Sequence, residues 1–272
     1  MAAVSQTPTF RTGVERVQLD VAVTRGGRPV AGLTATDFTV ADNGVAQHIE
    51  AAESEDAALS VQLVLDTSSS VSGPRLQRLI EASTGLLNAL RPFDRAGLIT
   101  FSTSVDVKVP MTSDIERVKR AVGTVRGMGA TSLRDAVALA LDAPAGEGTR
   151  RLILVFSDGA DTTSWLRSDD IVESARRSGV VVHLVEIRGL DGRSPFSVAL
   201  TKAAAGRIFS ASSESDLAQV FTRALAEMRS RYLLTFAPQA ANVAGWHDLK
   251  VTTRANGVEV QARPGYFVSP PR

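Results

Sequence analysis

The stretch Val61–Ser70 (VQLVLDTSSS) decides the expected fold of this chain. Its first five residues, Val61–Leu65, are mostly apolar, which favours a strand buried on both faces of a parallel sheet. Asp66 follows at the carboxyl end of that strand, where open α/β sheets bind their ligands. Ser68 and Ser70 alternate with Asp66, so the three side chains can converge in one loop. Such oxygen donors suit Mg²⁺, Mn²⁺ or Ca²⁺, although a Ser-rich turn after a strand is by itself most often only a turn.

Two further stretches place oxygen-bearing side chains beside regular structure. Arg151–Phe156 (RLILVF) predicts a second buried strand, and Ser157 and Asp158 follow it. Thr131 precedes the run SLRDAVALAL, whose apolar residues recur at helical spacing. Because the carboxyl ends of parallel strands meet at one edge of a sheet, we expect Asp158 and Thr131 to lie beside Asp66.

These three pieces, in this order, resemble the metal-site loops of von Willebrand factor type A domains. The pieces are DTSSS, the threonine of GATSLRDAV and the aspartate of VFSDGADT, and the resemblance runs from about Leu59 to Tyr232. It implies a metal-ion-dependent adhesion site, to which two aspartates, two serines and a threonine contribute directly or through water. Carried over to this chain, those residues are Asp66, Ser68, Ser70, Thr131 and Asp158.

The resemblance also implies how such a site is used. Few carboxylates contact the ion, so Mg²⁺, or Mn²⁺ or Ca²⁺ in its place, keeps much of its positive charge and some water-filled positions. A partner protein can then displace one water with an Asp or Glu carboxylate. We therefore expect a protein-binding module of the adhesion or interaction type, and not an enzyme.

The order of the apolar runs predicts a two-part chain. Over 59–231, strand and helix patterns alternate, which favours an α/β fold with a doubly wound, mostly parallel, Rossmann-like sheet. Residues 1–58 and 232–272 instead show period-two alternation, with hairpin signals at Asp42-Asn43-Gly44 and Asn256-Gly257. Since domain ends tend to lie close together, we expect the two β segments to pair into one β-sandwich-like domain with the α/β domain inserted. Two separate β appendages are the alternative.

The two β segments carry a resemblance of their own. The opening GRPVAGLTATDFTVADNG and the closing RPGYF resemble the end pieces of a bacterial, acidobacterial-type subfamily of these domains. We expect a location in the bacterial envelope or outside the cell. No signal peptide is visible at the start, which leaves a removed leader and a cytoplasmic location both open.

Composition excludes several classes of protein. The 272 residues are 44% hydrophobic and 22% charged, as in one or two ordinary globular domains. Thirty basic residues against 29 acidic ones give a net charge of +1 without a basic stripe, so a nucleic-acid partner is not expected. The absence of cysteine excludes disulfides and thiolate metal sites. No apolar run approaches the ~18 residues of a membrane helix.

Two other functions also fit parts of the pattern. A metal-dependent, phosphatase-like hydrolase would use Asp66 as its nucleophile, but the strand-end loops offer no lysine to hold a phosphate. A structural envelope module with an unused metal site is the third interpretation. His48, His183 and His247 lie on three separate predicted strands, so we expect structural or surface roles for them and no histidine metal site.

Three apolar residues and one further acid lie near the predicted site. Trp165, Leu166 and Phe196 fall near sheet ends, where core packing is favoured over a surface that faces a partner. Asp161 is either an extra acid of the site or a solvated loop carboxylate, and the second is favoured. Further along the sheet, Ser113–Glu116 has the pattern of a capping box at a helix start.

The last predicted helix, Ser213–Arg231, runs into the next strand with no glycine or proline between Leu217 and Phe236. In relatives of the resembled family, this helix can slide when the metal site engages a ligand. A slide here would pull on the first C-terminal strand. We therefore expect a coupling of about 1–3 kcal/mol between the metal site and the β domain, with a rigid scaffold as the alternative.

Overall fold

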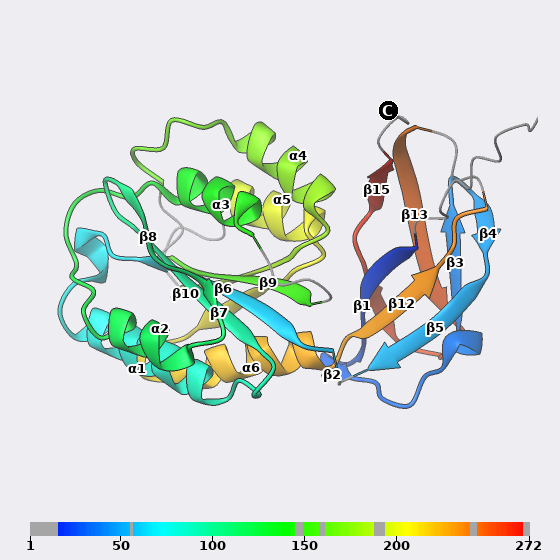
Figure 1. Cartoon of the computed structure of the whole chain (residues 1–272), viewed down its shortest axis with the longest axis horizontal. Coiled ribbons are helices and arrows are strands. Elements are labelled where there is room, and N and C mark those ends of the chain that lie inside the picture. Colours follow the sequence, from blue (N-terminus) through cyan, green and yellow to red (C-terminus); the bar gives the residue numbers. More distant parts are fainter. Residues whose placement is uncertain are drawn as a thin grey trace, which may run out of the picture.

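The computed structural model describes residues 16–54, 57–144, 149–157, 161–187, 194–239 and 244–268. Within these ranges the chain forms an α/β part and a smaller all-β part that lie side by side (Figure 1). No helix in the described residues is long and apolar enough to cross a membrane.

The α/β part is built on a six-stranded sheet with the order β11-β10-β9-β6-β7-β8. Neighbouring strands are parallel except for β7 and β8, which are antiparallel, so the predicted mostly parallel sheet is confirmed. The strands are β6 (Leu59–Asp66), β7 (Arg95–Phe101), β8 (Val105–Thr112), β9 (Arg150–Phe156), β10 (Val181–Ile187) and β11 (Ile208–Ala211). All eight residues of β6 are buried, as its apolar run predicts for a central strand.

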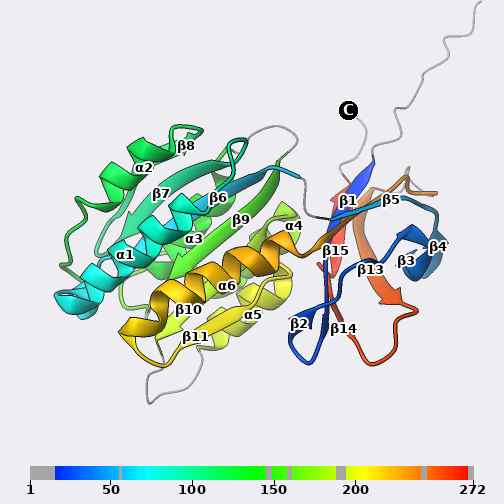
Figure 2. The same ribbon diagram turned by 90° about the horizontal axis from the view of Figure 1, so that it is seen from below.

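Helices cover both faces of this sheet (Figures 1 and 2). One face carries α1 (Pro74–Asn88), α2 (Ile115–Val122) and α6 (Leu217–Arg229), and the other carries α3 (Leu133–Asp142), α4 (Ser168–Ser178) and α5 (Pro195–Ala203). Alternate residues of the strands supply the two cores. Leu63 packs under the first group of helices and Val64 under the second.

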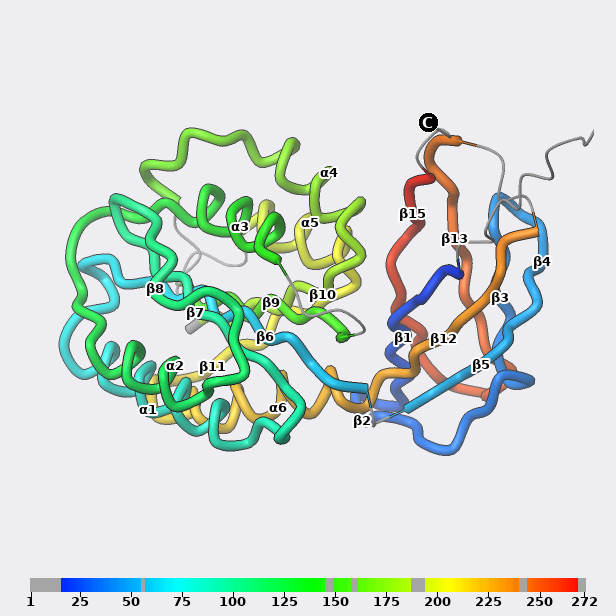
Figure 3. Tube along the Cα trace, viewed as in Figure 1, coloured from blue at the N-terminus to red at the C-terminus, as the bar shows by residue number. Residues whose placement is uncertain are grey.

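The all-β part consists of two small antiparallel sheets around a third core. The first sheet holds β14 (Glu259–Gln261), β1 (Val17–Arg25), β12 (Tyr232–Phe236) and β5 (Ile49–Ser54), with β2 (Arg28–Pro29) beside β1. The second holds β15 (Gly265–Val268), β13 (Gly245–Thr253), β3 (Phe38–Asp42) and β4 (Val45–Gln47). Strands from the two ends of the chain pair directly, β1 with β12 and β3 with β13, and Figure 3 shows these segments interleaved.

Charged side chains are buried where α6 meets β12. Glu227 of α6 accepts hydrogen bonds from Arg231 (Nη2 to Oε1, 2.8 Å), and it lies 2.7 Å from Nε2 of His183 on β10. The His183 and Arg231 side chains are fully buried. Nearby, Arg150 pairs with Asp20 of β1 across the two parts. The two parts of the molecule are therefore joined through paired charges as well as through the chain.

Helix α2 begins differently from the prediction. Asp114, and not Ser113, is the N-cap residue, and its carboxylate accepts a hydrogen bond from the backbone N–H of Arg117 at 2.9 Å. The predicted capping box at 113–116 is therefore wrong. An ionised carboxylate one residue further along accepts the same kind of backbone donor more strongly than a hydroxyl does.

Candidate metal centre

Asp66 is the last residue of β6, and its side chain is buried. Its Oδ1 accepts a hydrogen bond from the backbone N–H of Ser68 at 2.8 Å, which closes a tight turn after the strand. Its Oδ2 accepts one from the hydroxyl of Ser157, the residue that follows β9, at 3.1 Å. The carboxylate therefore ties the ends of two neighbouring strands together, and its orientation is fixed by both.

Ser68 and Ser70 meet directly beyond this turn. Their hydroxyl oxygens are 3.0 Å apart, with Ser68 buried and Ser70 exposed. A short 3-10 helix over Ser69–Val71 follows Ser68, and within this turn the two alternate serines share a side. The structure thus brings together three of the predicted ligands, Asp66, Ser68 and Ser70.

The loop before Thr131 lies against this serine turn. The backbone N–H of Ser69 donates to the carbonyl of Gly129 at 3.0 Å, and that of Met128 donates to the carbonyl of Thr67 at 2.8 Å. Gly129 has a φ of +85°, and a Cβ there would lie 2.5 Å from the Thr103 hydroxyl. Only glycine fits this position without strain, so the contact between the two loops depends on it.

Thr131 is buried beside these loops, and its backbone is held from the other side. Its N–H donates to the Thr162 hydroxyl at 3.0 Å, and its carbonyl accepts from the N–H groups of Thr162 and Thr163 at 2.9 and 3.1 Å. The hydroxyl of Thr131 itself has no hydrogen-bond partner among the residues that the structure describes. Its oxygen therefore remains available as a ligand. The helix it precedes, α3, begins two residues later at Leu133.

The fifth predicted ligand, Asp158, lies outside the described residues. Asp161, a little further on, is no free loop carboxylate, because it accepts hydrogen bonds from the backbone N–H of Arg134 and from the Ser164 hydroxyl, both at 2.8 Å. Burial raises the pKa of Asp161, but the hydrogen bonds from Arg134 and Ser164 outweigh that effect and hold its pKa below the ordinary value. Asp161 is thus engaged in holding the start of α3.

The donor set fits a hard divalent cation. Carboxylate and hydroxyl oxygens are the ligands that Mg²⁺, Mn²⁺ and Ca²⁺ prefer. In the described parts of the chain, no three or more His, Cys, Asp or Glu residues are grouped to hold an ion. Among the described residues, the predicted ligand set offers one carboxylate, from Asp66, and three hydroxyls, from Ser68, Ser70 and Thr131.

Trp165 and Leu166 form an exposed apolar rim near Thr131. Their side chains are 94% and 43% exposed, so the prediction of core packing is wrong for both, whereas Phe196 is buried as predicted. The reason is local, because the two backbone N–H groups each donate to the carboxylate of Asp135 on α3 at 3.0 Å. These two hydrogen bonds hold the loop against α3 and leave the side chains of Trp165 and Leu166 exposed.

Sequence patterns did not reveal several residues that shape this site. The Ser157 hydroxyl donates to the carboxylate of Asp66. The Thr103 hydroxyl accepts the N–H of Ala130, and the Thr162 hydroxyl accepts the N–H of Thr131. Each comes directly or within a few residues after a predicted central strand, and that position is the signal that could have found them. The histidines behave as predicted, with His48 exposed and His183 and His247 buried against Glu227 and Asp42.

Comparison with known proteins gives a consistent result. The family model described as "von Willebrand factor type A domain" matches residues 60–223. The inter-alpha-trypsin inhibitor heavy chain H4 of Homo sapiens is 28% identical over 132 residues, and that of Bos taurus is 25% identical over the same length. The matched region is 44% of this chain but only 14% of the length of those relatives.

Solved structures show the same fold at low sequence identity. BatB from Bacteroides thetaiotaomicron is 19% identical with a TM-score of 0.51, over 63% of this chain and 98% of that one. A von Willebrand factor type A protein from Catenulispora acidiphila is 12% identical with a TM-score of 0.57, and the match covers 96% of this chain and 76% of that one. A third match is proximal thread matrix protein 1 from the mussel byssus, which is described with a "zinc occupied MIDAS motif". It is 14% identical with a TM-score of 0.55, and the match covers 65% of this chain and 47% of that one.

Proposed function

This chain belongs to the von Willebrand factor type A domain family, and we propose that it is a divalent-metal-dependent protein-binding module. The observation that supports this most directly is the turn after β6, where the Asp66 carboxylate accepts the N–H of Ser68, the Ser68 and Ser70 hydroxyls lie 3.0 Å apart, and the loop before Thr131 packs against them. The similarity to a byssus protein whose related motif is described as zinc-occupied adds support for a metal in this place.

Five residues would hold the ion: Asp66, Ser68, Ser70, Thr131 and Asp158. A bound Mg²⁺, or Mn²⁺ or Ca²⁺, supplies positive charge that attracts a carboxylate of the partner. The chain supplies the rest. Asp66 is fixed by Ser68 and Ser157, so the site needs little rearrangement when it takes up an ion. The serine pair contributes oxygens without adding negative charge that would compete with a partner's acid.

The apolar rim narrows the class of partner. Trp165 is 94% exposed, and a loop clamped by Asp135 presents it three residues from Thr162, which bonds to Thr131. Exposed tryptophans are frequent anchors of protein interfaces. We therefore propose that the partner presents an Asp or Glu with a large apolar side chain close to it.

Metal-dependent thermal stability tests the site. Mg²⁺ or Mn²⁺ should raise the melting temperature of the wild type and leave that of Asp66→Ala and Ser68→Ala unchanged. At 100 times the dissociation constant, the added stability is about 2.7 kcal/mol. Ser69→Ala is the matched control, because Ser69 is exposed, lies in the same turn, and takes part only through its backbone. An equal metal response in all four proteins contradicts the proposal.

We further propose that the chain is not an enzyme and that it acts in the bacterial envelope or outside the cell. The second point is supported by the similarity to an "aerotolerance-related membrane protein" from Bacteroides fragilis, 18% identical with a TM-score of 0.50, over 62% of this chain and all of that one. The two small sheets of the all-β part would then form a β-sandwich that mounts the binding domain. Hydrolysis of phosphate esters in Mg²⁺ that is lost in Asp66→Ala would instead establish the hydrolase function.

A further inference from the structure

Gln62 is a buried polar residue in the middle of the central strand, and the metal centre does not use it. It is 4% exposed, and its neighbours along β6, Val61 and Leu63, belong to the apolar core on the other face of the sheet. Its Nε2 donates one long hydrogen bond, 3.3 Å, to the carbonyl of Leu63. Its Oε1 accepts none from any residue that the structure describes. This oxygen is not among the fully buried side-chain atoms that lack a partner, so solvent can reach it, and a polar side chain at this depth in the central strand needs a reason.

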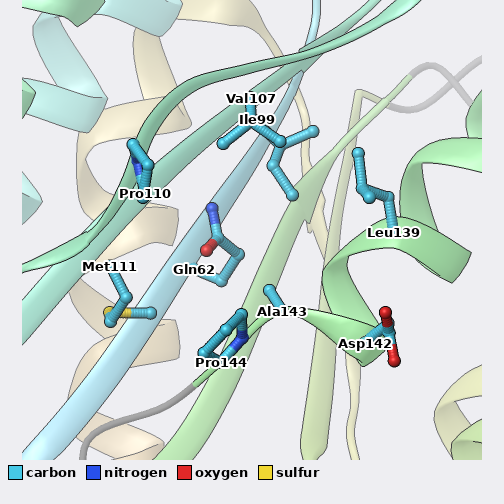
Figure 4. Close-up of a pocket in the computed structure, with 9 residues that line it drawn as sticks. All are labelled: Gln62, Ile99, Val107, Pro110, Met111, Leu139, Asp142, Ala143 and Pro144. Atoms are coloured by element: carbon cyan, nitrogen blue, oxygen red, sulfur yellow. The ribbon is translucent and has the colours of Figure 1, made fainter.

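This amide lies at the base of a cavity of about 230 Å³, which we call the Gln62 pocket. The pocket opens between β8 and the end of α3, and Figure 4 shows Gln62 between the side chains of these two elements. Its walls are formed by Ile99, Val107, Pro110, Met111, Leu139 and Pro144. A polar group is thus surrounded by apolar walls, the usual arrangement in small-molecule sites.

Three local features create the space. Gly97 is the partner of Gln62 on β7, and a Cβ there would lie 2.5 Å from Oε1 of Gln62. The pairing of β7 with β8 is irregular on both sides of Leu98, and such irregularities re-aim the side chains of the bulged strand. Helix α3 ends at Asp142, at the mouth of the pocket. The cavity therefore follows from the chain's own backbone geometry.

The lining selects a neutral ligand. Of the described residues around the pocket, the only charged one is Asp142, which is exposed at its mouth. Arg151 lies close by, but its guanidinium donates to the carbonyls of Leu141 and Ala143 at 3.1 and 2.8 Å. A charged group held beside Gln62, inside the pocket, would lose its hydration without gaining a counter-ion, because Asp142 stays at the mouth.

The amide of Gln62 selects the polar group of that ligand. Its oxygen can accept one hydrogen bond and its nitrogen can donate one, side by side. A carboxamide, lactam or urea group offers the complementary donor and acceptor. An apolar cavity of about 150 Å³ admits benzene, so 230 Å³ has room for a ring or short chain bearing such a group.

We propose that the Gln62 pocket is a binding site for a small, neutral, mostly apolar molecule that carries a carboxamide, lactam or urea group. Gln62 recognises that group through paired hydrogen bonds, and the walls from β8 and α3 hold the apolar remainder. The site is separate from the metal centre, since Gln62 lies four residues before Asp66 on β6, about 13 Å along the strand. It does not depend on the proposed metal function.

Benzamide and toluene are suitable probes, because they share a ring and only benzamide carries the amide. We expect benzamide, titrated into the isotope-labelled full chain, to shift the NMR signals of the Gln62 side-chain NH₂ and the Ala143 amide. Gln62→Met should weaken benzamide binding about tenfold or more while toluene binding stays within about twofold, because only the paired hydrogen bonds are lost. Ser69→Ala, the control at an exposed residue in the turn after the same strand, should bind benzamide like the wild type.

Equal benzamide affinity in Gln62→Met and wild type overturns the proposal, as does the absence of any shift at these residues up to the solubility limit of both probes. Leu139→Trp provides a second variant, since Leu139 is 37% exposed at the mouth and the larger side chain should block entry without disturbing the core. If Gln62 had only a structural role, Gln62→Met would resist urea less well than the wild type and would bind benzamide equally well. The proposal predicts unchanged or higher resistance and weaker benzamide binding.

Discussion

His183 should make the stability of this protein depend on pH, and the structure specifies the direction. The ring is fully buried between β10 and α6, with Nδ1 accepting the backbone N–H of Arg207 at 3.1 Å. Because Nδ1 must act as an acceptor, the proton is on Nε2, which donates to Glu227 at 2.7 Å, and the ring is neutral. Burial lowers the pKa of His183, and the positive charges of Arg231 and Arg207 add to this, against the opposing effect of Glu227.

The sign of the effect follows from proton linkage. The unfolded chain binds a proton at this histidine below its ordinary pKa of 6.5, whereas the folded chain does not until a lower pH. The stability from the neutral ring is therefore fully present above pH 6.5 and is lost as the pH falls below it. A single proton gives at most about 1.4 kcal/mol per pH unit, so between pH 7.5 and 5 the loss approaches about 2 kcal/mol. Arg231 and His183 lower the pKa of Glu227 despite its burial, so the stability from its ionised form is present above its ordinary pKa of 4.5 and is lost only as the pH falls below that value.

Urea unfolding followed by circular dichroism at pH 7.5, 6.5, 5.8 and 5.0 measures this loss. The variant His183→Gln should be less stable at pH 7.5 by about 1–3 kcal/mol, because the N–H of Arg207 loses its acceptor, but its stability should fall less between pH 6.5 and 5. His48→Gln, at an exposed histidine, should keep the full wild-type slope. The buried His247 is present in every protein and cancels in the comparison. A His183→Gln slope equal to that of the wild type would refute the reasoning.

Three further predictions follow from single contacts. Arg150→Met should lower the free energy of unfolding by about 3 kcal/mol in urea titrations, because Asp20 would be left in a largely buried place without its partner. The control Arg16→Met, at an exposed ion pair, should lower it by less than about 1 kcal/mol. Gly129→Ala should cost about 2 kcal/mol and weaken the metal-dependent rise in melting temperature, since the φ of +85° and the Thr103 hydroxyl leave no place for a Cβ. Hydrogen exchange over 225–236 should stay the same when Mg²⁺ and an acidic peptide are added, and a change there would show that α6 slides.

The parts of the fold that sequence could predict are those that depend on one run of residues. The mostly apolar runs Val61–Leu65 and Arg151–Phe156 predicted two central strands at their correct places, because a strand buried on both faces is mostly apolar. The polar residues at their ends then had to face the same sheet edge. The predicted convergence of Ser68 and Ser70, whose hydroxyl oxygens lie 3.0 Å apart, follows from their alternation in one short loop.

Prediction was poorer where the deciding contact lies far away in sequence. Nothing local shows that Asp135 holds the backbone of Trp165, 30 residues on, and so turns an apolar side chain outward. The same is true of Gln62, which looks like one polar exception in an apolar strand. Its meaning depends on Gly97 on the next strand and on where α3 ends. Such effects are tertiary, and propensity and periodicity carry no information on them.

The joint at the end of α6 bears on whether the metal centre and the all-β part can communicate. This end of the helix is held by charged contacts from three directions, with Glu227 bonded to His183, Arg229 to the buried Asp94, and the carbonyl of Met228 to Arg150. A slide along the helix axis would separate Arg229 from Asp94, and losing the partner of a buried charge costs about 3–5 kcal/mol. It would also break the hydrogen bond between Glu227 and His183, whereas Glu227 would keep Arg231 on its own side of the joint. An allosteric coupling supplies only about 1–3 kcal/mol. Partner binding alone therefore falls short of the cost of moving this end of α6, and the all-β part should behave as a fixed mount.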